Sequence, residues 1–148
     1  MILNTELRLD LPEPADEWKA SDAEEWRTLH LANTSAPVPF QDAFARLFSR
    51  DFPDDGQTIV TPLGHYVLIH ALIQQIFFAR QLSMPGAGLR LDDLGALEGA
   101  LAVWKAGWKR TPESSLDPQN PNGPVAFTST ALLGLAYIRL HVLSLIHI

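Results

Sequence analysis

The stretch TPLGHYVLIHALIQQIFFARQLSMPGAG, residues 61–88, decides the fold class of this chain. Thr61 is a residue type that caps helix N-termini, and Pro62 suits the first helical position, where its missing N–H costs nothing. The tetrapeptide PGAG at residues 85–88 ends the run, because proline and glycine stop helices. We therefore expect one long helix from Pro62 to Leu82.

This helix is apolar around most of its circumference. At about 100° per residue, its polar side chains His70, Gln74 and Gln81 fall on one narrow stripe. Nearly every other position is apolar, and a helix of that kind is buried on most of its surface. The pattern predicts a helix that is covered on most sides within an all-α helical bundle.

Two further long helices are expected downstream. Residues 91–110 predict an amphipathic helix, because Asp92 and Asp93 suit its first turn and apolar residues recur at helical spacing. Its apolar seam consists of Leu94, Leu97, Leu101, Trp104 and Trp108. Residues 125–142 predict a helix that is again apolar nearly all round. Two such helices need more neighbours than one amphipathic helix provides, so the bundle is expected to be incomplete and to expose apolar surface.

The N-terminal part predicts shorter helices. The whole chain is then expected to contain five or six helices and no convincing strand. Residues 39–49 carry phenylalanines at helical spacing. ADEWKA at 15–20 and AEEWRT at 23–28 resemble each other, and Ser21 followed by Glu24 has the spacing of a capping box. These two pieces are either a duplicated Trp-bearing docking motif or, as we favour, two surface helices that are each anchored by one tryptophan.

The polar segment TPESSLDPQNPNGP, residues 111–124, connects two of the predicted long helices and contains four prolines. Prolines restrict the unfolded chain, whereas a flexible linker is rich in glycine and serine. Asp117, Asn120 and Asn122 can close local turns with their side chains. We expect a stiff Pro-rich strap across the outside of the bundle.

The composition excludes several functions for this segment. It contains no cysteine, so disulfides, thiolate nucleophiles and cysteine-ligated zinc are absent from it. Lys and Arg number 11 against 17 acids, for a formal net charge of −6, and DNA binding by the segment itself is not expected. The apolar run at residues 67–79 is interrupted by three polar residues, so we expect no membrane span.

No residue pattern amounts to a catalytic, cofactor-binding or metal site. His65 and His70 lie about 140° apart on a helix and cannot share a metal ion. The pairs Asp54/Asp55 and Asp92/Asp93 are adjacent in sequence, whereas diphosphate-binding helices place their carboxylates a turn apart.

Four hydroxyl-bearing residues are further candidates. Ser114 and Ser115 have no histidine nearby in sequence. Thr61 and Thr111 precede prolines, the minimal pattern for proline-directed phosphorylation. Thr61 is better explained as a helix cap, so Thr111 is expected to be the exposed one of the two.

Three stretches resemble the fungal-specific transcription factor domain that follows a zinc finger pair of the two-cysteine, two-histidine type. They are residues 7–29, residues 66–82 and residues 100–140, and the resemblance spans Leu7 to His141. The specific portion begins at PESSLDP and continues through GPVAF to the LAYIRL of the last helix. The resemblance implies an all-helical regulatory region of a nuclear RNA polymerase II transcription factor, which is not a catalyst.

In that family the zinc finger contacts DNA and holds the zinc, and it lies outside the helical region. The resemblance therefore implies that this segment holds no cofactor and contacts proteins or the rest of its own chain. It also implies that DNA is contacted only through the zinc finger and that the protein is located in the nucleus. We expect residues 1–142 to form part of such a regulatory domain. The closing LSLIHI, residues 143–148, reads as the translation of a transposon-adapter sequence and is expected to be non-native.

Two rival functions stay open at this stage. Apolar helices are also typical of helical enzymes of the lipid or isoprenoid type, which would need paired carboxylate motifs on facing helices. A generic helical scaffold would be indicated by further helical repeats. We favour the fragment of a fungal regulatory domain.

Overall fold

The structure is a computed structural model that describes residues 6, 8–33, 37–49, 60–82, 90–120 and 123–145, the last four by their backbone alone. Six helices lie in these ranges: α1 Ala15–Trp18, α2 Ala23–Ala32, α3 Phe40–Leu47, α4 Pro62–Leu82, α5 Leu91–Arg110 and α6 Val125–Leu145. Strand-like pairing within the described ranges is limited to one antiparallel bridge between Asp10 and Pro39. The prediction of an all-α helical bundle is confirmed.

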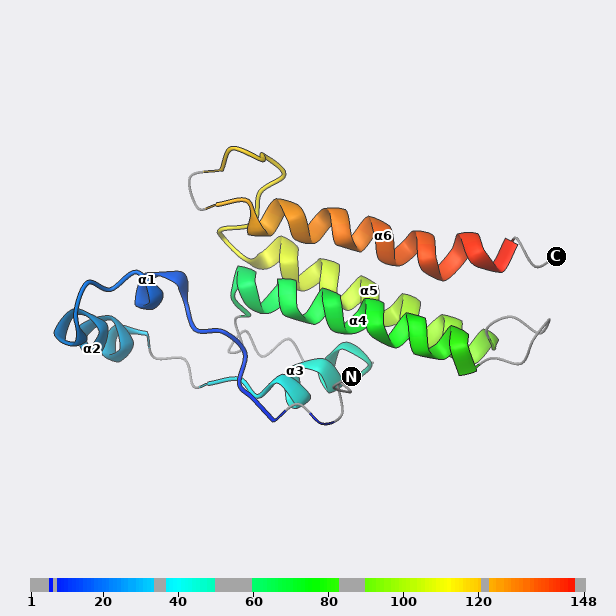
Figure 1. The fold of residues 1–148 in the computed structure, drawn as a ribbon, viewed down its shortest axis with the longest axis horizontal. Helices are drawn as coiled ribbons and strands as arrows, with labels where there is room; N and C mark the ends of the chain where they lie inside the picture. The colour runs from blue at the N-terminus through cyan, green and yellow to red at the C-terminus, as the bar shows by residue number, and fades with distance from the viewer. Residues whose placement is uncertain are drawn as a thin grey trace.

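Helix α4 lies at the centre of the bundle. It is less completely buried than its apolar sequence predicts, since Phe77 and Leu82 are exposed. It packs most extensively against α6, then against α5 and α3. Figure 1 shows α4 and α6 running in the same direction, with α5 antiparallel to both and α3 below them. The start of α4 agrees with the expected cap, since the Thr61 hydroxyl accepts a hydrogen bond from the Gly64 N–H at 3.0 Å.

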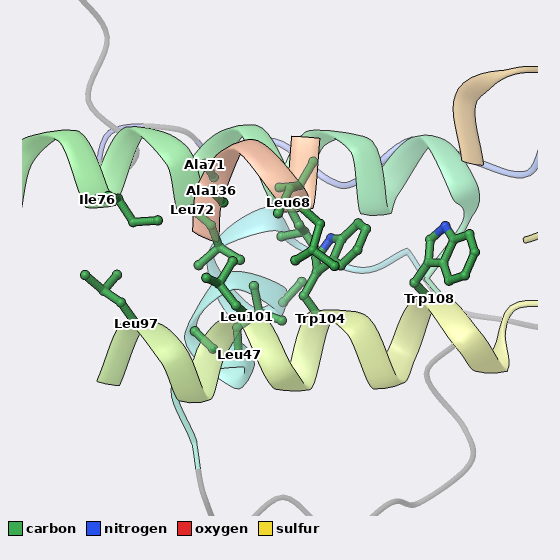
Figure 2. Packing of buried hydrophobic residues seen from close by; sticks show 14 of the residues in the cluster. Leu47, Leu68, Ala71, Leu72, Ile76, Leu97, Leu101, Trp104, Trp108 and Ala136 are labelled. Atoms are coloured by element: carbon green, nitrogen blue, oxygen red, sulfur yellow. The ribbon is translucent and has the colours of Figure 1, made fainter. Parts of the chain in front are cut away.

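The predicted seam of α5 forms the core against α4. Trp104 is 1% exposed, and its indole N–H donates to the carbonyl oxygen of His65 on α4 at 2.9 Å. Figure 2 shows the seam side chains pointing across at apolar side chains of α4. The buried seam residues are Leu97, Leu101, Trp104 and Trp108, and Leu94 packs at their edge. Burial of this kind is the main favourable contribution to folding.

Helix α6 is buried on one side. The side chains that face α4 and α5 are small or aliphatic: Ala126, Ser129, Leu133, Ala136 and Leu140. The Ser129 hydroxyl donates to the backbone oxygen of Val125 at 2.9 Å, which satisfies a polar group that is completely buried. Although the helix is apolar nearly all round, the bundle covers only this part of its circumference.

The Pro-rich strap is tied by local hydrogen bonds, as predicted, but it lies at one end of the bundle and not across its outside. Figure 1 shows it joining the neighbouring ends of α5 and α6. The Asp117 carboxylate accepts the Gln119 N–H at 2.9 Å, and the Asn120 amide donates to the Glu113 carbonyl at 3.2 Å. Gly123 has φ +97°, a backbone conformation that favours glycine. At the end of the strap, the Trp108 indole donates to the Ala126 carbonyl at 3.2 Å and so links α5 to α6. The expected turn at Asn122 lies outside the described residues.

The α1–α2 hairpin, residues 15–33, corrects two predictions. Its tryptophans do not anchor it, because Trp18 is 73% and Trp26 42% exposed. The cap of α2 is also one residue later than expected: Asp22 accepts the Glu25 N–H at 2.8 Å. The helix starts one residue later because the Asp22 carboxylate, and not the Ser21 hydroxyl, accepts the free backbone N–H of Glu25. The Ser21 N–H and hydroxyl both donate to the Glu25 carboxylate. Figure 1 places this hairpin beyond one end of the bundle.

By length and mean hydropathy, α4 passes the test for a membrane-spanning helix, alone among the helices described. Polar residues interrupt it at His70, Gln74 and Gln75, and it packs against α3, α5 and α6.

Candidate functional site

The most distinctive exposed feature of the bundle is a strip of apolar residues along α6, which we call the α6 outer face. It consists of Phe127, Ala131, Gly134, Leu135 and Ile138. Ile138 is 55% exposed, although isoleucine is among the residue types most often buried. Phe127 and Leu135 are each more than a third exposed.

The α6 outer face lies opposite the buried side of the helix. At about 100° per residue, its five residues cover an arc of about 100°, while the residues packed on α4 are centred on the other side. None of the five is polar, and Thr128 and Arg139 border the arc along one edge. An uncharged apolar strip with a polar border has the composition of the centre of a protein–protein interface.

The position of α6 leaves this face open to a partner. The helix packs mainly on α4 and in fewer places on α5. Figure 1 shows it at the upper edge of the bundle, so one long side has no described helix against it. Ala131 and Gly134 have little or no side chain, and small residues allow the backbone of a partner helix to come close. The face can therefore accept a second amphipathic helix.

The carboxylate pairs do not form a diphosphate-binding site in the part of the chain described. Asp92 and Asp93 are exposed in the first turn of α5, where they complement the helix dipole and do not act as its cap. A shallow groove between α3 and α5 has Asp92 at its edge, and its other described lining residues bring no second carboxylate. Asp54 and Asp55 lie outside the described residues.

The two histidines of α4 point apart, as predicted, but their expected environments are reversed. His65, expected simply at the helix start, is 4% exposed and packs edge-on against Trp104. His70, expected to be partly buried, is exposed beside Tyr66. Burial lowers the pKa of His65 to about 4, so this imidazole is neutral at pH 7. A buried neutral histidine of this kind is part of the core.

Three of the four hydroxyl candidates have structural roles. Thr111 was expected to be exposed and is instead 5% exposed, because its hydroxyl folds back to donate to the Gly107 carbonyl at 3.1 Å. A kinase could not reach it in the folded chain. The Ser115 hydroxyl accepts the Asp117 N–H in the strap, and Thr61 caps α4.

Comparison with known proteins identifies no relative: no family model, curated protein or solved structure matches this chain.

Sequence reasoning did not identify two features. The α6 outer face could not be located because α6 is apolar nearly all round, so its sequence does not show which arc the bundle leaves open. The second is the burial of Glu17 in the hairpin. Its partners His30 and Asn33 are 13 and 16 residues away along the chain, and no short motif connects them.

Proposed function

We propose that this chain belongs to the helical regulatory region of a fungal zinc-finger transcription factor and acts there by protein contact. The resemblance of residues 7–29, 66–82 and 100–140 supports the assignment. The all-α architecture is compatible with it, and the second and third stretches lie on the bundle helices and the strap. The proposal places the protein in the nucleus, with DNA contact and zinc assigned to a zinc finger outside these residues.

The observation that carries the protein-contact part is the α6 outer face. Burying Ile138 and Leu135 against a partner would remove from water apolar area that the bundle leaves exposed. An amphipathic helix, from another protein or from elsewhere in the full-length protein, has the shape and polarity to cover this strip. Such contact needs no catalytic residue.

A tethered reporter assay tests the proposal. The chain is fused to a heterologous DNA-binding module in a fungal cell, and transcription of a reporter is compared with that given by the module alone. We expect a change in reporter output. The variants Leu135→Glu and Ile138→Glu should abolish the change, because a charge at the centre of an apolar contact must be desolvated without a partner.

Leu116→Glu is the matched control. Leu116 lies on the strap and is 69% exposed, so the same kind of substitution is made away from α6. This variant should behave as the wild type at equal protein abundance. A reporter that does not respond to the wild-type fusion would contradict the proposal and favour a generic helical scaffold.

Direct DNA binding gives a second check. Because the chain carries 17 acids against 11 basic residues, we expect no sequence-dependent binding to duplex DNA at physiological salt. Fluorescence anisotropy with labelled duplexes measures this. Sub-micromolar binding that depends on the DNA sequence would show that the acidic segment contacts DNA itself.

A further inference from the structure

The α1–α2 hairpin has a buried residue of an unusual kind. Helix α1 buries one residue, Glu17, and α2 buries none. The Glu17 side chain is only 2% exposed, whereas Trp18 and Leu31 point into solvent. Helices of four and ten residues are too short to be stable alone, so side-chain contacts must hold them together. In this hairpin the buried contact is made by a carboxylate.

Both oxygens of that carboxylate have defined neighbours. The Asn33 side-chain amide donates to Oε1 at 2.9 Å, and Nδ1 of His30 lies 3.1 Å from Oε2. Trp26 stacks on the His30 ring with centroids 4.7 Å apart, which fixes the plane of the imidazole. Glu13 completes the group, because one ligand atom each from Glu13, Glu17 and His30 lie within 4.8 Å of one another.

We propose that Glu13, Glu17 and His30 form a binding site for a divalent transition-metal ion, with Zn²⁺ as the ion that fits best, and that the ion staples α1 to α2. Imidazole and carboxylate groups are its usual nitrogen and oxygen ligands. Ligand atoms about 2.1 Å from a tetrahedral Zn²⁺ are about 3.4 Å apart. The 3.1 Å contact of His30 with Glu17 is already close to that spacing. Water would complete the coordination.

The charges and the outer contacts support a cation at this position. Two carboxylates and one neutral imidazole carry a charge of −2, which a divalent ion neutralises. The Asn33 amide donates a hydrogen bond to Oε1 of Glu17 and so orients Oε2 toward His30. Hydrogen-bond partners of metal ligands commonly orient them in this way. Metal binding requires His30 to be neutral, so any proton on Nδ1 is released to solvent. The alternative is a metal-free hairpin held by the direct contact of His30 with Glu17.

The two alternatives differ in titrations of the full chain. Metal is first removed with a chelator, and Zn²⁺ is then added in a calorimeter at pH 7.5, with Co²⁺ as a spectroscopic substitute. We expect one ion bound per chain, a Co²⁺ absorption band and quenching of Trp26 fluorescence. Glu17→Gln and His30→Gln should weaken binding by at least about tenfold, the scale seen for impaired metal sites.

Two more variants make the result decisive. Glu13→Gln removes a proposed ligand and leaves the contacts of Glu17 with His30 and Asn33 intact, so it should weaken binding even if the other variants disturb the hairpin. His70→Gln is the control, because His70 is an exposed histidine on α4 and should not affect binding. No saturable binding, or equal binding by Glu13→Gln and the wild type, would overturn the proposal. The site does not depend on the function proposed above.

Discussion

The bundle of α3–α6 and the α1–α2 hairpin are held together by different kinds of contact. In the bundle, α5 places Leu101 and Trp104, both at most 1% exposed, against the apolar side chains of α4 (Figure 2). In the hairpin, the buried position belongs to Glu17, and two tryptophans are exposed. The bundle is therefore stabilised by non-directional burial of apolar area, whereas the hairpin relies on directional contacts to one carboxylate.

The difference predicts two different responses to perturbation. Apolar burial is shared by many residues, so the bundle should unfold as one cooperative unit. The hairpin makes its main helix contacts within itself, between α1 and α2. It should therefore open locally, at a lower free-energy cost than global unfolding.

The largest effect is expected for Trp104→Ala in the centre of the bundle. The substitution leaves a cavity and deprives the His65 carbonyl of its indole donor, so the free energy of unfolding should fall by about 3–5 kcal/mol. Urea denaturation monitored by circular dichroism measures the change. A near-neutral shift in the midpoint would mean that the α4–α5 interface is not the core.

The next effect is a loss of bundle stability in acid through His65. Burial lowers the pKa of this histidine from 6.5 to about 4, and the nearby Arg110 acts in the same direction. Between these values the unfolded state binds more protons, so stability falls as the pH decreases from 6.5 to 4, by about 3 kcal/mol in all. Glu17 and Glu25, whose pKa values are lowered by hydrogen bonds, lose their contribution only below their usual value of 4.5.

Denaturation at several pH values tests this assignment. His65→Phe keeps a ring of similar shape beside Trp104 and cannot titrate, so its stability should vary less between pH 6.5 and 4. His70→Phe is the matched control, because His70 is exposed on the same helix. An unchanged pH dependence in His65→Phe would show that another group causes the acid sensitivity.

The sequence predicts the bundle better than the hairpin for the same physical reason. Periodicity and caps gave the bounds of α4 and α5 as observed, and the seam from Leu94 to Trp108 is the core. Caps and periodicity are local features of the sequence. The position of the apolar face of a helix follows from the type and spacing of its residues. Tryptophan was expected to anchor the short helices on the same reasoning, and Trp18 and Trp26 do not, because their hairpin does not pack an apolar side onto the bundle.

The candidate surfaces were only partly predictable. An incomplete bundle with exposed apolar surface was expected, and the exposure of Phe127, Leu135 and Ile138 agrees with it. Which residues of α6 are exposed depends on where α4 and α5 lie around this helix. That arrangement is part of the tertiary structure and cannot be read from the sequence of α6. The contacts of Glu17 with His30 and Asn33 likewise require the hairpin to be folded first.

A local effect is expected for Glu17→Gln in the metal-free chain. The neutral amide lacks the charge of the carboxylate that contacts both His30 and Asn33, so backbone amides of residues 15–33 should exchange with deuterium faster. The bundle helices should keep their exchange rates. Glu24→Gln is the control, because Glu24 is exposed in the first turn of α2. Faster exchange throughout the chain would contradict the separation of hairpin and bundle.

The smallest effect is expected for Trp18→Ala, which completes the comparison with Trp104→Ala. The same substitution is made in the same chain, but Trp18 is 73% exposed whereas Trp104 is 1% exposed. Little apolar area returns to water, so the free energy of unfolding should change by less than about 0.5 kcal/mol. Denaturant midpoints of the two variants, measured side by side, give the contrast directly. A loss above about 1 kcal/mol for Trp18→Ala would mean that this tryptophan packs against something in solution, and the duplicated Trp-bearing docking motif would then become the better interpretation of the hairpin.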